Sequence, residues 1–166
     1  FGLFLNIHYV PTLKLRRLVS AVEVTFDNPD ASFTRGGYIY ICLPWISKMQ
    51  WHAFSLVQLE GDTGTSSVCM AVVGDWTKRL HTALERPTSR PAWIWGPYPA
   101  PFCAAPNFDN LICIASGVGI TPALSVVTSY SHSRKVSLIW ICRDPDLIEF
   151  YLHRTYSKHG YFLVFY

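Results

Sequence analysis

Charged side chains are scarce in this 166-residue chain, because Asp, Glu, Lys and Arg together make up only 15% of it. The 14 Lys and Arg residues exceed the 11 Asp and Glu residues by three, and they do not gather into a basic run. A positive charge this weak does not predict nucleic-acid binding. Half of the residues are hydrophobic, which excludes an intrinsically disordered segment. The length suits one domain or two small ones, so we expect a globular, ligand-binding protein.

Paired cysteines are also lacking. The five cysteines are an odd number and include no Cys-x-x-Cys pair, which argues against a zinc site or a disulfide framework. We therefore expect mainly reduced, buried cysteines, and this favours a reducing, cytosol-facing compartment. The six histidines show no metal-ligand spacing, so no metal site is predicted.

No secretory signal or clear membrane span is present. The chain starts at Phe1 without a basic segment and cleavage site, and it reads as an internal fragment of a longer protein. Residues 111–127 carry no charge, yet Gly117, Gly119 and Pro122 interrupt them. At 17 residues they lie at the short limit for a transmembrane helix, so we expect a buried strand, a turn and a helix instead.

The pattern of elements changes once along the chain. Alternating apolar residues and turn residues predict short strands over 13–26, 38–43, 54–59 and 68–73. A helix is expected at 77–84, and prolines predict an extended connector at 87–106. Strands at 111–115, 136–142 and 161–166 then alternate with helices at 122–130 and 146–155. This order predicts an antiparallel β-barrel or sandwich, followed by a parallel sheet with helices on its faces.

The glycine-rich turn from Gly117 to Pro122 is the most informative motif, because it follows a buried strand and opens a helix. Glycine lets the backbone approach a diphosphate, and free N–H groups at a helix start attract anions. Thr121 could donate its hydroxyl there, and Pro122 suits the first helical turn. A plain strand–helix turn remains the alternative.

Three other segments are candidates for ligand contacts. Residues 74–77 form a second strand–helix junction, where Asp75 or Thr77 either caps the helix or helps to bind an anion. An aromatic ring, an imidazole and a hydroxyl follow one another over 51–55 and could hold a planar heterocycle. Arg143 follows a predicted parallel strand and could bind a phosphate, or it could simply pair with Asp144.

Taken in order, these motifs resemble the dehydrogenase region of the NADPH oxidase / ferric-chelate reductase family. The resemblance covers the chain from about residue 16 to its end. The motifs that carry it are Gly37-Tyr38-Ile39-Tyr40 with Cys42-Leu43-Pro44, Trp51-His52-Ala53-Phe54-Ser55, Gly74-Asp75-Trp76-Thr77, Gly96-Pro97-Tyr98, Gly117-Val118-Gly119-Ile120-Thr121-Pro122 and Trp140-Ile141-Cys142-Arg143-Asp144. Six such motifs in one order are far more specific than any one of them.

The resemblance implies a fold like that of ferredoxin-NADP reductase, with an FAD-binding β-barrel over 12–105 and an NADP-binding α/β domain, truncated at its C-terminus, over 106–166. Electrons would pass from NADPH through FAD to haems of a membrane domain, which then reduces ferric iron or oxygen. The full-length protein would lie in a membrane with this segment on the cytosolic side. The cofactor-binding residues that the resemblance implies are His52, Ala53, Phe54, Ser55, Gly74, Asp75, Trp76, Thr77, Gly117, Gly119, Ile120, Thr121, Pro122, Cys142 and Arg143. Of these, Ser55 and Cys142 would be catalytic.

The sequence also departs from the family pattern. Ala53 replaces a usual Pro, and Ala71 stands where many members carry an Arg before the Gly-Asp-Trp-Thr turn. Loss of that cation weakens flavin-diphosphate binding unless Lys78, Arg79 or Arg90 compensates. Two alternatives therefore stay open beside the membrane oxidoreductase: a soluble flavin reductase of the same fold, and a degenerate, non-catalytic interaction domain.

Overall fold

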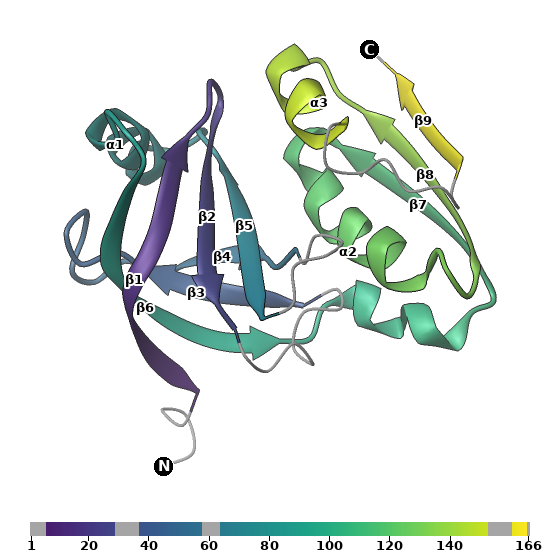
Figure 1. The fold of residues 1–166 in the computed structure, drawn as a ribbon, viewed down its shortest axis with the longest axis horizontal. Coiled ribbons are helices and arrows are strands. Elements are labelled where there is room, and N and C mark those ends of the chain that lie inside the picture. Colours follow the sequence, from purple (N-terminus) through teal and green to yellow (C-terminus); the bar gives the residue numbers. More distant parts are fainter. Residues whose placement is uncertain (1–5, 29–36, 58–63, 153–160, 166) are drawn as a thin grey trace.

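Two β-sheets and three α-helices make up the computed structural model, which describes residues 6–28, 37–57, 64–152 and 161–165 (Figure 1). The first sheet is antiparallel, with strand order β4-β3-β6-β1-β2-β5, and the second is parallel, with order β7-β8-β9. The strands are β1 (Ile7–Arg17), β2 (Ala21–Asp27), β3 (Tyr38–Cys42), β4 (His52–Ser55), β5 (Thr65–Ala71), β6 (Thr88–Tyr98), β7 (Asn110–Ser116), β8 (Lys135–Ile141) and β9 (Tyr161–Phe165). The helices are α1 (Asp75–Ala83), α2 (Ile120–Tyr130) and α3 (Pro145–Leu152), with short 3₁₀ helices η3 (Pro101–Asn107) and η4 (Gly117–Gly119).

The antiparallel sheet curls into a nearly closed barrel. Buried and more exposed residues alternate along its strands, as the sequence predicts. In β2 the side chains of Val22 and Val24 are fully buried, whereas Glu23 between them is not. A bridge between Val57 and Ser67 joins the two ends of the sheet. Helix α1 closes one end of the barrel, where Trp76, Leu80 and Leu84 join the barrel core.

The expected connector over 87–106 is wrong, because its first half is the long strand β6, which pairs with both β1 and β3. Proline lacks an N–H, so a proline-rich segment reads as a poor strand. Here, however, Pro91 and Pro97 lie where the register of strand pairing shifts. At such a bulge the residue does not have to donate a backbone N–H to the neighbouring strand, so proline is tolerated. The single strand expected over 13–26 is likewise two strands, β1 and β2, joined by a turn at 18–20.

The remaining elements agree with the sequence to within a few residues. Strand β4 lies at His52–Ser55 rather than 54–59, β5 at Thr65–Ala71 rather than 68–73, and α1 starts two residues earlier than expected. Parts of the strand expected at 54–59 and of the helix expected at 146–155 lie outside the described residues. Residues 111–127 form β7, a turn and most of α2, as expected. No helix that the structure describes has the length and apolarity that crossing a bilayer requires.

The parallel sheet carries both of its helices on one face, not on two as expected. Figure 1 shows α2 and α3 on the side of this sheet that faces the barrel. The strands follow one another in chain order, and right-handed crossovers made in one direction place successive helices on the same face. On the opposite face, the side chains of Ile112, Ile114 and Ile141 are exposed.

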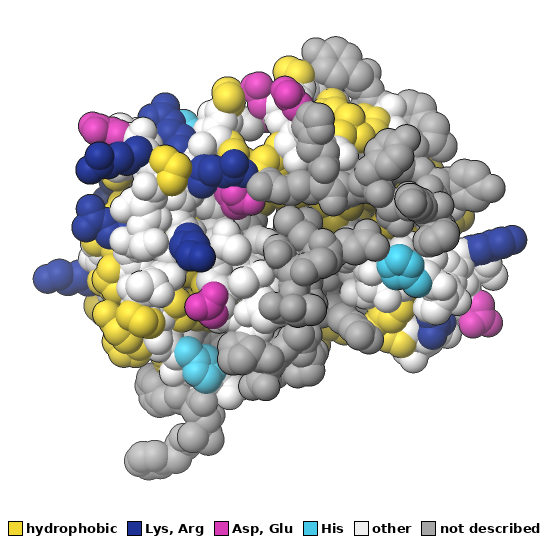
Figure 2. All heavy atoms as spheres, in the orientation of Figure 1, with side chains coloured by type: hydrophobic (Ala, Val, Ile, Leu, Met, Phe, Trp, Pro, Cys, Tyr) yellow, Lys and Arg dark blue, Asp and Glu magenta, His cyan; other side chains and the backbone are white. Residues whose placement is uncertain are grey.

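The two halves pack against each other. Ala21 and Cys69 of the barrel belong to the same buried cluster as Ile120, Leu124 and Trp140 of the α/β half. All five cysteines are free thiols, and four of them are buried, as expected. Cys103 is the exception, because it lies exposed in η3. Figure 2 shows that Lys and Arg side chains on one face are interrupted by acidic, polar and apolar groups and form no continuous basic stripe.

Candidate functional site

A cavity of about 590 Å³ lies where β4, the β5–α1 turn and the start of α2 meet. These three segments are far apart in the sequence, and each carries one of the predicted motifs. The predicted residues that line the cavity are His52, Ala53, Phe54, Ser55, Gly74, Asp75, Trp76, Thr77, Gly119, Thr121 and Pro122. The structure therefore brings most of the predicted site residues together in one place.

The barrel wall of this cavity is aromatic and holds two polar atoms without a protein partner. The rings of His52 and Phe54 lie 4.4 Å and 6.2 Å from the ring of Trp76. His52 Nε2 and Trp76 Nε1 are both buried, and neither makes a hydrogen bond with any residue that the structure describes. Because an unpaired buried polar group costs about 1–3 kcal/mol, these two atoms are suited to pair with a bound ligand. A planar, polar heterocycle fits this wall.

Burial of His52 makes the stability of the chain depend on pH. Desolvation lowers the pKa of the His52 imidazole from its usual 6.5. The unfolded chain then binds the proton more readily than the folded chain, so the free energy of unfolding falls as the pH drops below about 6.5. The free energy of unfolding stops falling once the pH is below the pKa of His52 in the folded chain.

We expect His52→Gln to remove this part of the pH dependence, as measured by urea unfolding at about pH 7.5 and about pH 5.5. The exposed His8 provides a matched control, because His8→Gln should leave the dependence as it is in the wild type. Equal pH dependence in wild type and His52→Gln would show that His52 is not the group responsible.

The β5–α1 turn presents the start of a helix to the cavity. The Thr77 hydroxyl accepts hydrogen bonds from the N–H groups of Val73 and Gly74, at 3.1 Å each, and donates to the Gly74 carbonyl at 2.9 Å. Gly74 is thus the N-cap residue of α1, and Thr77 at the third helical position holds it through a hydroxyl that is already occupied. The next N–H groups of the first turn have no acceptor within the helix. A Cβ built on Gly74 would meet nothing within 4 Å, so a ligand can approach the backbone here.

The glycine-rich turn before α2 forms the opposite wall. Gly117 has a φ of +50°, which favours glycine, and its carbonyl accepts a 2.8 Å hydrogen bond from Trp140 Nε1. The Thr121 hydroxyl donates to the Val118 carbonyl at 2.6 Å and so caps its own turn. A Cβ on Gly119 would point into open space. The turn is therefore held rigidly while Gly119 is left accessible.

Four predicted residues do not line the cavity. Gly117 is not among the lining residues, and the side chains of Ile120 and Cys142 are only 0% and 2% exposed. Arg143 is exposed where the chain leaves β8. Among the ion pairs of the described residues there is none between Arg143 and Asp144; the Asp144 carboxylate instead accepts N–H groups from Asp146 and Leu147, at 3.1 Å each, and caps α3.

Sequence reasoning missed several lining residues: Gln50, Cys69, Val73 and Val118. Cys69 and Ala71 both line the cavity, and alternation along β5 places them on one face, a signal that the sequence already contains. Among the described lining residues there is no Lys or Arg, and Asp75 is the only carboxylate. Arg79 contacts the lining, because its guanidinium donates to Gln50 Oε1 at 3.3 Å. Arg90 lies over the Trp45 ring and not in this wall.

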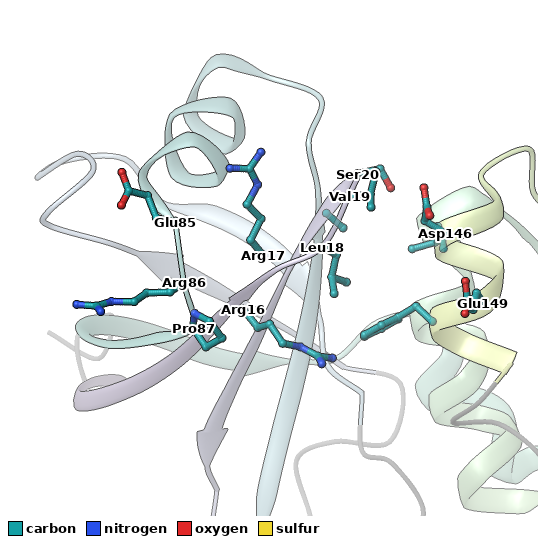
Figure 3. A pocket seen from close by; sticks show the side chains of 13 residues that line it. Arg16, Arg17, Leu18, Val19, Ser20, Glu85, Arg86, Pro87, Asp146 and Glu149 are labelled. Atoms are coloured by element: carbon teal, nitrogen blue, oxygen red, sulfur yellow. The ribbon is translucent and has the colours of Figure 1, made fainter.

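A larger hollow, of about 810 Å³, lies on another side of the molecule (Figure 3). Three arginines and three carboxylates line it, together with apolar residues of the β1–β2 turn and of α3. No predicted site residue reaches it. The chemistry-bearing motifs therefore select the smaller cavity as the candidate site.

Comparison with known proteins agrees with this arrangement. The sequence matches the FAD-binding domain family over residues 7–138. It is 29% identical over 148 residues to NADPH oxidase 4 of Rattus norvegicus, covering 76% of this chain and 26% of that protein. It is 33% identical over 157 residues to ferric reduction oxidase 4 of Arabidopsis thaliana, covering 86% of this chain and 21% of that protein. The chain thus spans about a quarter or less of these relatives.

The fold has a close counterpart among solved structures. A ferredoxin NADP⁺ reductase from Neisseria gonorrhoeae with bound FAD and NADP superposes with a TM-score of 0.70 at 17% identity, covering 96% of this chain and 68% of that one. The predicted fold, a flavin-binding type of barrel followed by a parallel sheet, is confirmed by this likeness. On the family match, the motif order and the fold together, the chain belongs to the FAD-binding domain family, in the form found in NADPH oxidases and ferric reductases.

Proposed function

We propose that this chain is the flavin-binding, NADPH-oxidising segment of a larger membrane oxidoreductase. The observation that carries the proposal is the single cavity in which two helix starts and the aromatic wall of β4 meet. Each helix start is suited to one diphosphate, so two dinucleotides could lie with their rings together. NADPH oxidases and ferric reductases are among the relatives, which supports NADPH as donor and either oxygen or ferric iron as final acceptor.

Each wall of the cavity has its own task in this proposal. The aromatic wall, from His52 to Ser55, would hold the flavin ring, and His52 Nε2 and Trp76 Nε1 would hydrogen-bond polar atoms of FAD. The turn over 74–77 holds the flavin diphosphate through backbone N–H groups. The turn over 117–122 holds the diphosphate of NADPH in the same way.

Bound FAD supplies the redox chemistry, since a flavin accepts two electrons as a hydride and releases them singly. The protein positions the flavin and the nicotinamide relative to each other. Ser55 lies on the cavity wall, where its hydroxyl can hydrogen-bond the reactive edge of the ring. Cys142 follows the carboxyl end of β8, next to that of β7, which is the edge where ligands of parallel sheets bind. We assign the nicotinamide to that edge.

The division of the chain and its partners belong to the same proposal. We assign 12–105 to FAD binding and 106–166 to NADPH binding, although β1 and the family match already begin at residue 7. A haem-bearing transmembrane domain of the same protein would accept the electrons, with this segment on the cytosolic side of the membrane. Its relatives, NADPH oxidases and ferric reductases, support this placement.

The proposal is tested by the optical spectrum of the purified chain. We expect a flavin absorption band after addition of FAD, and bleaching of that band when NADPH is added without oxygen. A chain that stays colourless with FAD, and releases no heat with NADPH in calorimetry, would instead be the non-catalytic interaction domain.

Arg143 is expected to select NADPH over NADH, because an exposed guanidinium at the strand end can bind the 2′-phosphate. Arg143→Ala should raise the KM for NADPH about five-fold, as suits an exposed ion pair, and leave the KM for NADH unchanged. Steady-state assays with both nucleotides measure this difference. Equal effects on the two nucleotides would remove this role from Arg143.

A further inference from the structure

Tyr151, in the last turn of α3, connects the two walls of the cavity from behind. Its side chain is only 2% exposed, and its hydroxyl lies 3.4 Å from Thr121 Oγ1. The same hydroxyl hydrogen-bonds the thiol of Cys69 on β5. Cys69 and Thr121 both line the cavity, one from the barrel and one from the α/β half, whereas Tyr151 does not.

These contacts form one chain of hydrogen bonds. The Thr121 hydroxyl donates to the Val118 carbonyl, which is the shortest of these contacts at 2.6 Å. Between Thr121 and Tyr151 either hydroxyl can be the donor. Tyr151 directs its own proton toward the Cys69 sulfur. Burial and the contact with Cys69 raise the pKa of Tyr151 well above its usual value, so the hydroxyl keeps the proton that it donates.

We propose that Tyr151 is a positioning residue, which holds the turn over 117–121 against strand β5 and so sets the width of the nucleotide site. This inference rests on the proposed function, because it assigns NADPH to that turn. The hydrogen-bond chain runs from the barrel through α3 to the Val118 carbonyl, beside the accessible Gly119. A substitution of Tyr151 therefore affects the turn while every residue that lines the cavity stays unchanged.

Helix α3 is suited to hold the turn in place, because it is anchored to the barrel near both of its ends. Just before its start, the Asp144 carboxylate caps the helix and also accepts a hydrogen bond from the Ser20 hydroxyl of the β1–β2 turn. Figure 3 shows this turn, with Ser20, facing the first turn of α3, with Asp146. In the last turn of α3, Tyr151 makes the second anchor. A helix held at two points cannot rotate freely against the barrel.

The test is Tyr151→Phe, which keeps the ring and its edge contacts with Trp140 and Phe150 but removes the hydroxyl. We expect the Kd for NADP⁺ to rise about five-fold, as suits the loss of one net hydrogen bond. The Kd for FAD should not change. Independently of any ligand, amide hydrogen exchange over 117–121 should become faster. Tyr130→Phe is the matched control, since Tyr130 is also buried in the α/β half but does not line the cavity.

Variants of Cys69 separate the hydrogen-bond chain from simple packing. Cys69→Ser keeps a side chain that can hydrogen-bond Tyr151 and should retain the slow exchange over 117–121, whereas Cys69→Ala should lose it. If Tyr151→Phe exchanges over 117–121 no faster than Tyr130→Phe, the inference is overturned whether or not the chain binds nucleotide. If Tyr151→Phe exchanges faster over 117–121 but the wild type binds no NADP⁺, the positioning role of Tyr151 is supported and the proposed function fails.

Discussion

Gly119→Ala is expected to weaken NADP⁺ binding about a hundred-fold while the fold and the affinity for FAD stay unchanged. Gly119 has a φ of −62° and a ψ of −6°, which alanine adopts without strain, and its Cβ would meet nothing within 4 Å. The added methyl would therefore cost the fold nothing, but it would stand where the diphosphate must approach the backbone. Loss of two charge-assisted hydrogen bonds, at about 1.5 kcal/mol each, raises Kd by about a hundred-fold.

The matched control is the other open glycine of the cavity. Gly74 also has room for a Cβ, but it lies at the start of α1, where we place the flavin diphosphate. Gly74→Ala should therefore weaken FAD binding and spare NADP⁺ binding. Calorimetric titration of both variants with both ligands measures the two effects. Loss of both ligands in each variant would contradict the assignment of one diphosphate to each helix start.

Ala71→Arg is expected to tighten FAD binding by about ten-fold or more. Ala71 lines the cavity at the end of β5, and no Lys or Arg is among the described residues of that lining. An arginine there would lie beside the start of α1 and could bind the flavin diphosphate through a charge-assisted pair. We expect the substitution to lower the folding stability only slightly, because the Ala71 side chain is partly exposed to solvent.

A charge-matched control separates this local effect from a change in net charge. Thr82→Arg adds the same charge in the last turn of α1, at an exposed position away from the cavity. It should leave the Kd for FAD unchanged in fluorescence titrations. If both variants tighten binding equally, attraction of the whole chain for the anionic ligand accounts for the gain. If neither does, the diphosphate is not held beside Ala71.

Much of the fold could be predicted because local patterns agree with the final packing. Val22 and Val24 alternate with polar residues and point into the barrel, and the glycine turn opens α2 where the sequence places it. Strand β6 could not be predicted in this way. Its prolines at 91 and 97 contradict a strand locally, and only pairing with a shifted register on two neighbours makes the segment acceptable there.

In the candidate site, too, some features could be predicted from the sequence and others could not. The glycine-rich turn, the His52–Ser55 segment and the β5–α1 turn could each be identified from residue types. The burial of the Ile120 and Cys142 side chains could not be predicted, because nothing local says that they point into the core. Whether Arg79 or Arg90 lies nearer to the site was likewise undecided until the barrel closed and brought Arg79 to its rim.

By itself the sequence determined the kinds of chemistry available: two backbone turns for diphosphates, an aromatic segment for a ring and the family to which the chain belongs. These depend on residues close together along the chain, so local steric and hydrogen-bonding rules are enough. Only the tertiary structure decided that the three segments share one cavity, and that Tyr151 joins Cys69 to Thr121 behind it. Contacts between residues so distant in the sequence arise from closure of the barrel and its packing against α2 and α3, and no local pattern encodes that packing.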